Sequence, residues 1–325
     1  MQNFEFYSAS SLEDGLDYLA ERAGGCKIIA GGTDLIPTLR HADLSFSVTR
    51  QKSDPESVSD RGELCKIVAG GGDVIPMMPK DTHPDYVLNI LEIEELRGIT
   101  ETDDTVRIGP TTTFTEMMES EVLNRCLPLL VQAASSIGGP QIRNRGTIGG
   151  NIASNAPCAD VLPAVLALDG NLEVHSKKSG VRILPVAEAL EAPYKTSIAA
   201  DEILTAILIN KLPVGMRMGF EKLGRRNAMT TARMNMSVVF KLEDDGTISD
   251  LRIVPGAVMP VTRRMTAAEK ILSGKKPQAS LIEESAKQMA DSVFKITGTR
   301  WSTEYKKPVV QNIYKRVFKQ LLQDN

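Results

Sequence analysis

The chain has 325 residues, of which 42% are hydrophobic and 24% are charged, and its formal net charge is −3. These values are typical of a globular protein with two domains, and the balanced charge argues against nucleic acid or a membrane as the main partner. The four cysteines stand far apart and only three histidines occur, so neither a metal site nor a disulfide framework is predicted. The N-terminal sequence lacks the apolar segment of a signal peptide, and we expect a cytoplasmic protein.

The first elements alternate between strand and helix. A short strand is expected over residues 4–7, and Ser10 or Ser11 can cap the helix that follows. The segment Cys26 to Ala30 (CKIIA) has the composition of a buried strand, and it leads directly into Gly31-Gly32.

This strand and its glycines are repeated further along the chain. CKIIAGGTDLIP begins at Cys26 and CKIVAGGGDVIP begins at Cys65, an offset of 39 residues. The polar stretch 47–63 between them has the composition of an exposed loop. Two copies are too few for a solenoid, so we predict a duplicated segment of 39 residues, around residues 41–79, inside one domain.

Further strands and helices are predicted up to about residue 213, where the texture of the sequence changes. Asp160 precedes an apolar helix, VLPAVLAL. We therefore predict one domain over 1–213 and a second over 214–325, in which Asp245-Gly246 turns a hairpin. The remaining predicted elements are strands at 87–93 and 106–108, a helix near 116–118 capped by Thr113 or Thr115, a helix at 128–137, strands near 172, 181 and 202, and helices at 267–272, 280–294 and 308–322.

Two glycine motifs have the chemistry of a pyrophosphate site. Glycine lets a phosphate approach the backbone N–H groups, and a following helix adds the partial positive charge of its N-terminus. AGGTD at Ala30–Asp34 and TIGGN at Thr147–Asn151 both meet this need. Taken alone, each glycine pair is more often a tight turn, and neither matches the Rossmann or P-loop motif.

Together the motifs resemble a family. AGGTDLIP and IRNRGTIGGNIASNAPCAD are similar to the FAD-binding subunit of the molybdenum hydroxylases, which include xanthine, carbon monoxide and nicotinate dehydrogenases and 4-hydroxybenzoyl-CoA reductase. NILEIEELRGI and FEKLGRRNAM extend the resemblance over nearly the whole chain. It implies an α+β fold: a two-part FAD-binding domain of the PCMH type, then a smaller domain with a three-stranded antiparallel sheet and helices.

The resemblance also implies which residues bind FAD, and it assigns no catalytic or metal-binding side chain. Asp160 would contact the adenosine part, or alternatively cap a helix; Lys222 would lie near the isoalloxazine ring, or alternatively be a solvated strand lysine. Arg225 and Arg226 are more simply surface charges. The cofactor-binding residues so implied are Ala30, Gly31, Gly32, Thr33, Asp34, Ile137, Thr147, Ile148, Gly149, Gly150, Asn151, Asp160, Leu204 and Lys222.

The chain departs from the family pattern in two respects. The second motif copy, Ala69–Asp73, contests or shares the role of the first, and we favour the first because it retains Thr33. The benzoyl-CoA type of relative has a cysteine-rich insertion for an iron–sulfur cluster. This sequence has no such cysteines, so no cluster is expected in the chain itself.

The resemblance implies an electron-transfer subunit of a cytoplasmic heterotrimer. A large partner would hold the molybdenum cofactor, and a small partner would hold [2Fe-2S] clusters. The FAD here, bound without a covalent bond, would pass electrons to an acceptor such as NAD or ferredoxin. One alternative is a stand-alone flavin oxidase, in which a histidine beside the first glycine motif often holds FAD; the nearest histidine here is His41. The other is a scaffold subunit that has lost FAD.

Overall fold

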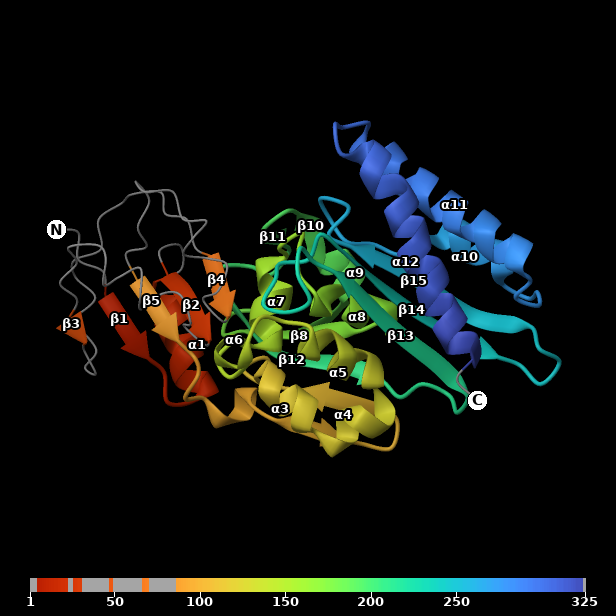
Figure 1. Ribbon diagram of the computed structural model, residues 1–325. Helices are drawn as coiled ribbons and strands as arrows, with labels where there is room; N and C mark the ends of the chain where they lie inside the picture. Colours follow the sequence, from red (N-terminus) through yellow and green to blue (C-terminus); the bar gives the residue numbers. More distant parts are fainter. Residues whose placement is uncertain (1–4, 23–25, 31–46, 49–65, 70–85, 324–325) are drawn as a thin grey trace.

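The computed structural model describes residues 5–22, 26–30, 47–48, 66–69 and 86–323. Three layered parts follow one another along the molecule (Figure 1). A parallel sheet at the N-terminal side leads to a five-stranded antiparallel sheet with helices, and then to a three-stranded sheet covered by long helices. Within the described residues, none of the helices combines the length and the apolar character needed to span a membrane.

The parallel sheet has the strand order β3-β1-β5-β2-β4. Strands β2 and β4 carry the two copies of the repeat and pair in matching register, with Ala30 opposite Ala69. Both strands therefore end at the same edge of the sheet. The strands are β1 (Glu5–Ser8), β2 (Cys26–Ala30), β3 (Ser47–Val48), β4 (Lys66–Ala69) and β5 (Tyr86–Asn89).

Helix α1 (Leu12–Glu21) joins this sheet to the next one. Ser11 caps the helix, because its hydroxyl accepts a hydrogen bond from the N–H of Asp14 at 3.1 Å. The buried side chains of Leu16 and Leu19 share a hydrophobic core with Ile203 of the second sheet. The two sheets are thereby packed into one body around α1.

The second sheet is antiparallel, in the order β6-β7-β12-β8-β9, and its apolar face is covered by helices. Side chains of β8 alternate between buried and half-buried positions, as expected for a strand with one face in the core. The strands are β6 (Ile99–Glu101), β7 (Thr105–Ile108), β8 (Asn171–Ser176), β9 (Gly180–Pro185) and β12 (Glu202–Asn210), and β10 (Leu190–Ala192) pairs with β11 (Lys195–Thr196). The helices are η2 (Glu94–Leu96), α3 (Phe114–Glu119), α4 (Glu121–Cys126), α5 (Pro128–Ser135), α6 (Pro140–Arg143), α7 (Ile148–Ser154), α8 (Val161–Ala167) and α9 (Val186–Ala189).

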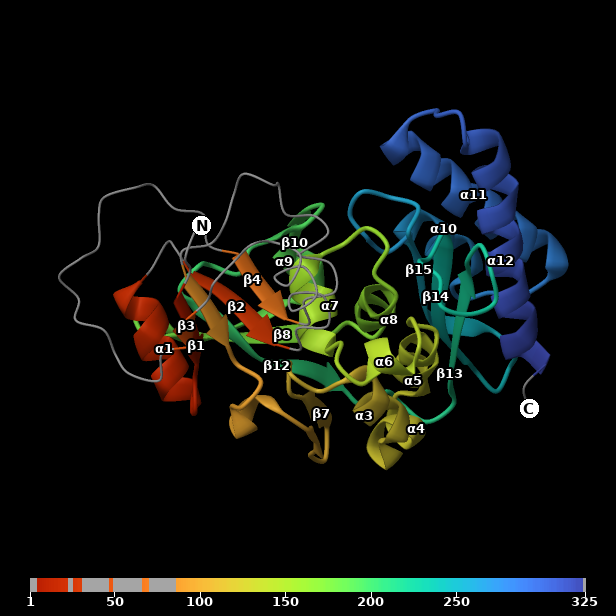
Figure 2. The ribbon, with the colours of Figure 1, turned by 60° about the vertical axis from the view of Figure 1, so that its left-hand side comes forward.

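The third sheet is buried on both faces. Strands β13 (Met216–Leu223), β14 (Met234–Leu242) and β15 (Ile248–Gly256) form an antiparallel meander. One face packs on the C-terminal helices and the other on α5 and α8 (Figures 1 and 2). This double burial explains the unbroken run of buried residues in β14. The C-terminal helices are α10 (Thr266–Leu272), α11 (Ala279–Thr297) and α12 (Thr303–Gln323).

The α+β fold and the three-stranded sheet with helices are confirmed, as are the caps at Ser11 and Thr113 and the hairpin at Asp245-Gly246. The expected start of the last helix at Pro308 is wrong, because α12 begins at Thr303 and contains the proline. The predicted start is therefore five residues late.

Candidate cofactor-binding site

The second glycine motif forms the first turn of helix α7. Thr147 is the N-cap, and its hydroxyl accepts a hydrogen bond from the N–H of Gly150 at 3.2 Å. The side-chain oxygen of Asn151 accepts from the N–H of Leu162 at 3.2 Å, which ties α7 to α8. The amide nitrogen of Asn151 has no partner among the described residues. It is a donor of the type that a phosphate or sugar oxygen accepts.

Gly149 has a packing role that the sequence did not indicate. Its N–H donates to the carbonyl of Pro110 at 2.9 Å. A Cβ atom at Gly149 would lie 2.5 Å from Cβ and 2.6 Å from the carbonyl oxygen of Pro110. Glycine is therefore required here for the close approach of α7 to the preceding segment, whatever ligand the motif holds. A valine at this position should therefore disturb the fold itself as well as any ligand site.

The first glycine motif is described only up to Ala30. Its other four residues, Gly31, Gly32, Thr33 and Asp34, lie outside the described residues, as do 70–73 of the second copy. Strand β4, which leads into the second copy, packs against α7 (Figure 2).

A buried ion pair lies between the two predicted domains. The ammonium group of Lys222, on β13, is 2.6 Å from the carboxylate of Asp160, and both side chains are less than a tenth exposed, at 8% and 9%. Lys222 also donates to the carbonyl of Ser136 at 2.9 Å. The alternative of a solvated lysine is wrong for Lys222. Asp160 is the N-cap residue of α8, as its alternative held, but its side chain makes no capping hydrogen bond to the helix.

Asn235, on β14, completes this cluster, and no local sequence signal pointed to it. Its amide donates to the carboxylate of Asp160 at 3.0 Å and to the carbonyl of Ala159 at 3.2 Å. Its side-chain oxygen is buried and accepts no hydrogen bond in the described structure. A buried acceptor without a donor is costly, so this oxygen is suited to a ligand hydroxyl or N–H group. A Cβ atom at Gly256 would lie 2.0 Å from the same oxygen, which requires glycine there.

The other two implied residues lie in different surroundings. Ile137 is half-buried, packs against the main core, and follows Ser136, the residue whose carbonyl binds Lys222. Leu204 is 3% exposed and lies on β12 opposite Val174. The structure thus brings Ile137, Asp160 and Lys222 together, whereas Leu204 is a residue of the sheet core.

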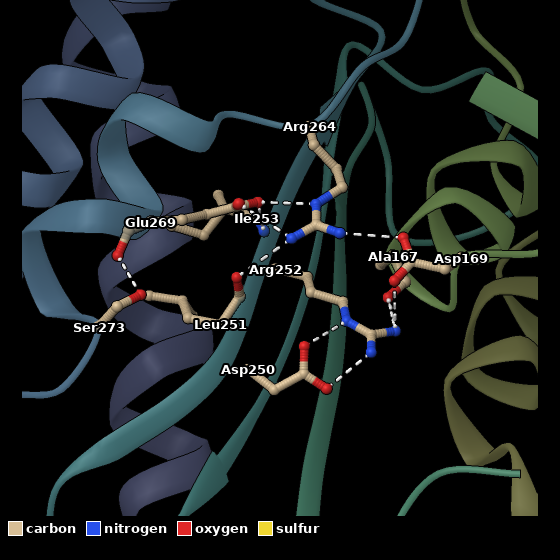
Figure 3. Close-up of polar contacts among 9 residues, drawn as sticks. All are labelled: Ala167, Asp169, Asp250, Leu251, Arg252, Ile253, Arg264, Glu269 and Ser273. Atoms are coloured by element: carbon tan, nitrogen blue, oxygen red, sulfur yellow. Dashed lines mark hydrogen bonds and ion pairs between the residues drawn. The ribbon is translucent and has the colours of Figure 1, made fainter. Parts of the chain in front are cut away.

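The opposite end of α8 is held by a second group of charges (Figure 3). Arg252 of β15 donates to the carbonyl of Ala167 at 3.2 Å and lies 3.1 Å from the carboxylate of Asp169. Arg264 donates to Asp169 at 2.9 Å and pairs with Glu269 at 3.0 Å. The C-terminal sheet therefore makes polar contacts with both ends of α8, and these contacts fix the position of Asp160 relative to Lys222.

Two family sequence models match the chain. The model described as the FAD binding domain in molybdopterin dehydrogenase matches residues 55–212. The model described as the CO dehydrogenase flavoprotein C-terminal domain matches residues 219–321. The first match begins between the two copies of the repeat, so it includes the second copy and not the first.

Curated relatives match over almost their whole length. The xanthine dehydrogenase FAD-binding subunit of Escherichia coli O157:H7 is 35% identical over 316 residues, which cover 96% of this chain and 94% of the relative. The carbon monoxide dehydrogenase medium chain of Hydrogenophaga pseudoflava is 30% identical over 317 residues, covering 96% and 95%. A solved carbon monoxide dehydrogenase from Hydrogenophaga pseudoflava superposes with a TM-score of 0.79 at 26% identity, covering 99% of this chain and 98% of the other. The chain therefore belongs to the family of FAD-binding medium subunits of the xanthine dehydrogenase and carbon monoxide dehydrogenase type.

Proposed function

We propose that this chain binds FAD without a covalent bond and transfers electrons as one subunit of a molybdenum-dependent oxidoreductase complex. The family models, and relatives named as FAD-binding subunits and medium chains of dehydrogenases, support this proposal. A flavin exchanges electrons singly or in pairs, which suits a position between iron–sulfur clusters and a two-electron acceptor. A large molybdenum subunit and a small iron–sulfur subunit would be the partners, with NAD or ferredoxin as the acceptor. The cytoplasmic location stays a prediction.

The observation that carries the site is the buried cluster of Lys222, Asp160 and Asn235. A buried lysine held at 2.6 Å from one carboxylate is a fixed positive charge at the junction of the two domains. One donor and one acceptor that FAD could satisfy lie on other elements of the same region, namely the amide nitrogen of Asn151 on α7 and the buried oxygen of Asn235 on β14. The residues present therefore fit a polar cofactor. We propose that Lys222 lies nearest the ring system, while Thr147–Asn151 lie nearest the pyrophosphate.

Existing hydrogen bonds limit how many N–H groups the first turn of α7 can offer to a pyrophosphate. The N–H groups of Gly149 and Gly150 already donate to Pro110 and Thr147. Asp160 is engaged by Lys222 and Asn235 through both carboxylate oxygens. We therefore propose that Asp160 acts mainly by holding Lys222, and that the partial charge of the helix N-terminus matters more than individual glycine donors.

For the repeated motif, two observations now favour the second copy, Ala69–Asp73, over the first. Strand β4, which leads into that copy, packs against α7, and the match to the FAD-binding domain begins at residue 55. The first copy retains Thr33, which was the reason for preferring it on sequence. For the domains, the two family matches leave 213–218 between them, and we propose a division at residue 213.

The test of the function is the visible absorption of the purified chain before and after acid precipitation. We expect a yellow protein whose flavin appears in the supernatant. Flavin that remains with the precipitate would instead support a covalently linked oxidase. A protein that stays colourless after incubation with FAD, alone and together with its molybdenum and iron–sulfur partners, would support the scaffold alternative.

Matched substitutions can show which copy of the repeated motif binds FAD. Gly71→Val should abolish FAD retention, whereas Gly32→Val should leave it intact, because only one copy needs a close approach of the backbone to phosphate. Thermal unfolding of both variants, each measured after removal of any bound flavin, would show whether each still folds. The reverse result would assign the site to Ala30–Asp34.

A further inference from the structure

The turn between α11 and α12 and the first turn of α12 carry exposed aromatic side chains, remote in sequence from the candidate cofactor site. This turn projects from the end of the helical layer (Figure 1). Trp301, the single tryptophan of the chain, is 95% exposed, and Tyr305 is 49% exposed. The turn is ordered by local bonds: the N–H of Arg300 donates to the hydroxyl of Thr303 at 2.8 Å, and the N–H of Thr303 donates to the carbonyl of Arg300 at 2.9 Å. An ordered turn therefore presents a large apolar ring to solvent.

Three basic side chains gather around these rings. The guanidinium carbon of Arg233, which precedes β14, lies 5.9 Å from the ring centroid of Tyr305. Burial lowers the pKa of Lys306, and the positive charges of Arg233 and Arg300 lower it further. Arg233, Arg300 and Lys306 form no ion pair with a carboxylate in the described part of the chain. Like charges are thus held together without compensation in a chain whose net charge is −3.

The connection between β13 and β14 extends the positive charge toward the candidate site. Arg225 and Arg226 lie on this connection and are exposed. Among the residues that the structure describes, the guanidinium of Arg226 binds only backbone carbonyls, those of Ala228 and Met229. The same connection begins just after Lys222, so positive charge continues along the chain from the buried lysine to Arg233.

We propose that Arg233, Arg300, Trp301, Tyr305 and Lys306, together called the basic aromatic surface, dock an acidic segment of a partner protein. Carboxylates of the partner would neutralise the three cations, and an apolar contact would cover Trp301. Tryptophan, tyrosine and arginine are the residues that most often dominate the energy of protein–protein interfaces. The negative net charge of the whole chain disfavours a long polyanion such as nucleic acid.

The single tryptophan lets the full-length chain report on this surface directly. We would titrate the chain with a deca-glutamate peptide at low ionic strength and follow tryptophan emission. Saturable binding with a change in emission is expected, and it should weaken as salt screens the charges. The double variant Arg300→Glu/Lys306→Glu should bind about tenfold more weakly or not at all, because two attractive charges become repulsive.

The matched control is Lys287→Glu, which reverses an exposed charge on α11 outside the surface and should bind the peptide as the parent chain does. Equal weakening in the control and the double variant would overturn the proposal, since the attraction would then follow net charge. A response to inorganic pyrophosphate but not to deca-glutamate would also overturn it and would identify a small-anion site. Both titrations measure tryptophan emission and do not depend on flavin content, so their outcome is independent of the test of FAD binding.

Discussion

Helix α8 is held by the C-terminal sheet at both ends, but the two ends are built differently. At its start, one buried lysine faces one buried aspartate, with exposed fractions of 8% and 9%. Beyond its end, Asp169 is 53% exposed and is shared by two arginines, each of which has a further carboxylate partner. The lysine at the start has one carboxylate partner, which is buried, whereas the second group, although Arg252 and Glu269 are buried, includes the exposed carboxylates of Asp169 and Asp250, so that water and alternative partners remain available. Sensitivity to substitution should therefore be concentrated at the start of α8.

The largest effect is expected for Lys222→Met. This change leaves the carboxylate of Asp160 buried without its cationic partner, which should cost about 3–5 kcal/mol in the free energy of unfolding. Urea denaturation measures the loss, and flavin absorbance measures FAD retention. The double variant Lys222→Met/Asp160→Leu should recover much of the stability without recovering FAD. If Lys222→Met were as stable as the parent chain, the start of α8 would not be more sensitive to substitution than its end.

A smaller effect is expected for Arg252→Met at the other end. Asp250 and the carbonyl of Ala167 lose a charged donor, but Asp169 keeps Arg264, so the free energy of unfolding should fall by about 1–3 kcal/mol. FAD should be retained, because the cluster around Lys222 is untouched. Loss of FAD in a folded Arg252→Met variant would mean that the two ends act as one unit.

Asp169→Asn should have a still smaller effect. Asp169 has a positive φ of 49°, which asparagine also tolerates, so the backbone should be unchanged. The loss should be below about 1 kcal/mol, as for other half-exposed ion pairs, and high salt should reduce it further. The comparison would fail if this substitution destabilised the chain as much as Lys222→Met.

The pH dependence of stability should include a contribution from the second sheet. Hydrogen bonds from Arg125 and Lys211 lower the pKa of Glu101 from 4.5 to about 2. Because the folded pKa is depressed, this stabilisation is present above pH 4.5 and is lost as the pH falls toward 2. Glu101→Gln should therefore be slightly less stable than the parent chain near neutral pH, and the two should converge in acid. A constant difference from pH 7 to pH 2 would contradict this assignment.

Local signals in the sequence predicted much of the fold. The caps at Ser11 and Thr113 and the hairpin at Asp245-Gly246 each depend on neighbouring residues, and the structure has all of them. The site was less accessible to such reasoning. Asp160 and Lys222 were each identified by resemblance, but their ion pair joins residues 62 positions apart and exists only because the third sheet packs beside α5 and α8. Long-range packing of this kind leaves no periodic pattern in the sequence.

Two other features of the site share this origin. Asn235 lies within an apolar strand, and its role arises from the helix start that meets it across the domain junction. Gly149 was interpreted as an opening for phosphate, yet its nearest neighbour is the backbone of Pro110, 39 positions earlier. The sequence predicted that glycine is needed at this position, but it did not predict that the backbone of Pro110 is the reason.

The pairing of β2 with β4 indicates that the chain could lose one copy of the repeat without losing the inner strands of the parallel sheet. In the order β3-β1-β5-β2-β4, both outermost strands come from the segment 31–69. Excising that segment would join Ala30 directly to Gly70, leaving one uninterrupted copy of the repeat. The three inner strands, β1-β5-β2, would stay contiguous and correctly ordered. The two described strands of that segment, β3 and β4, thus lie at the edges of the sheet and do not separate its three inner strands.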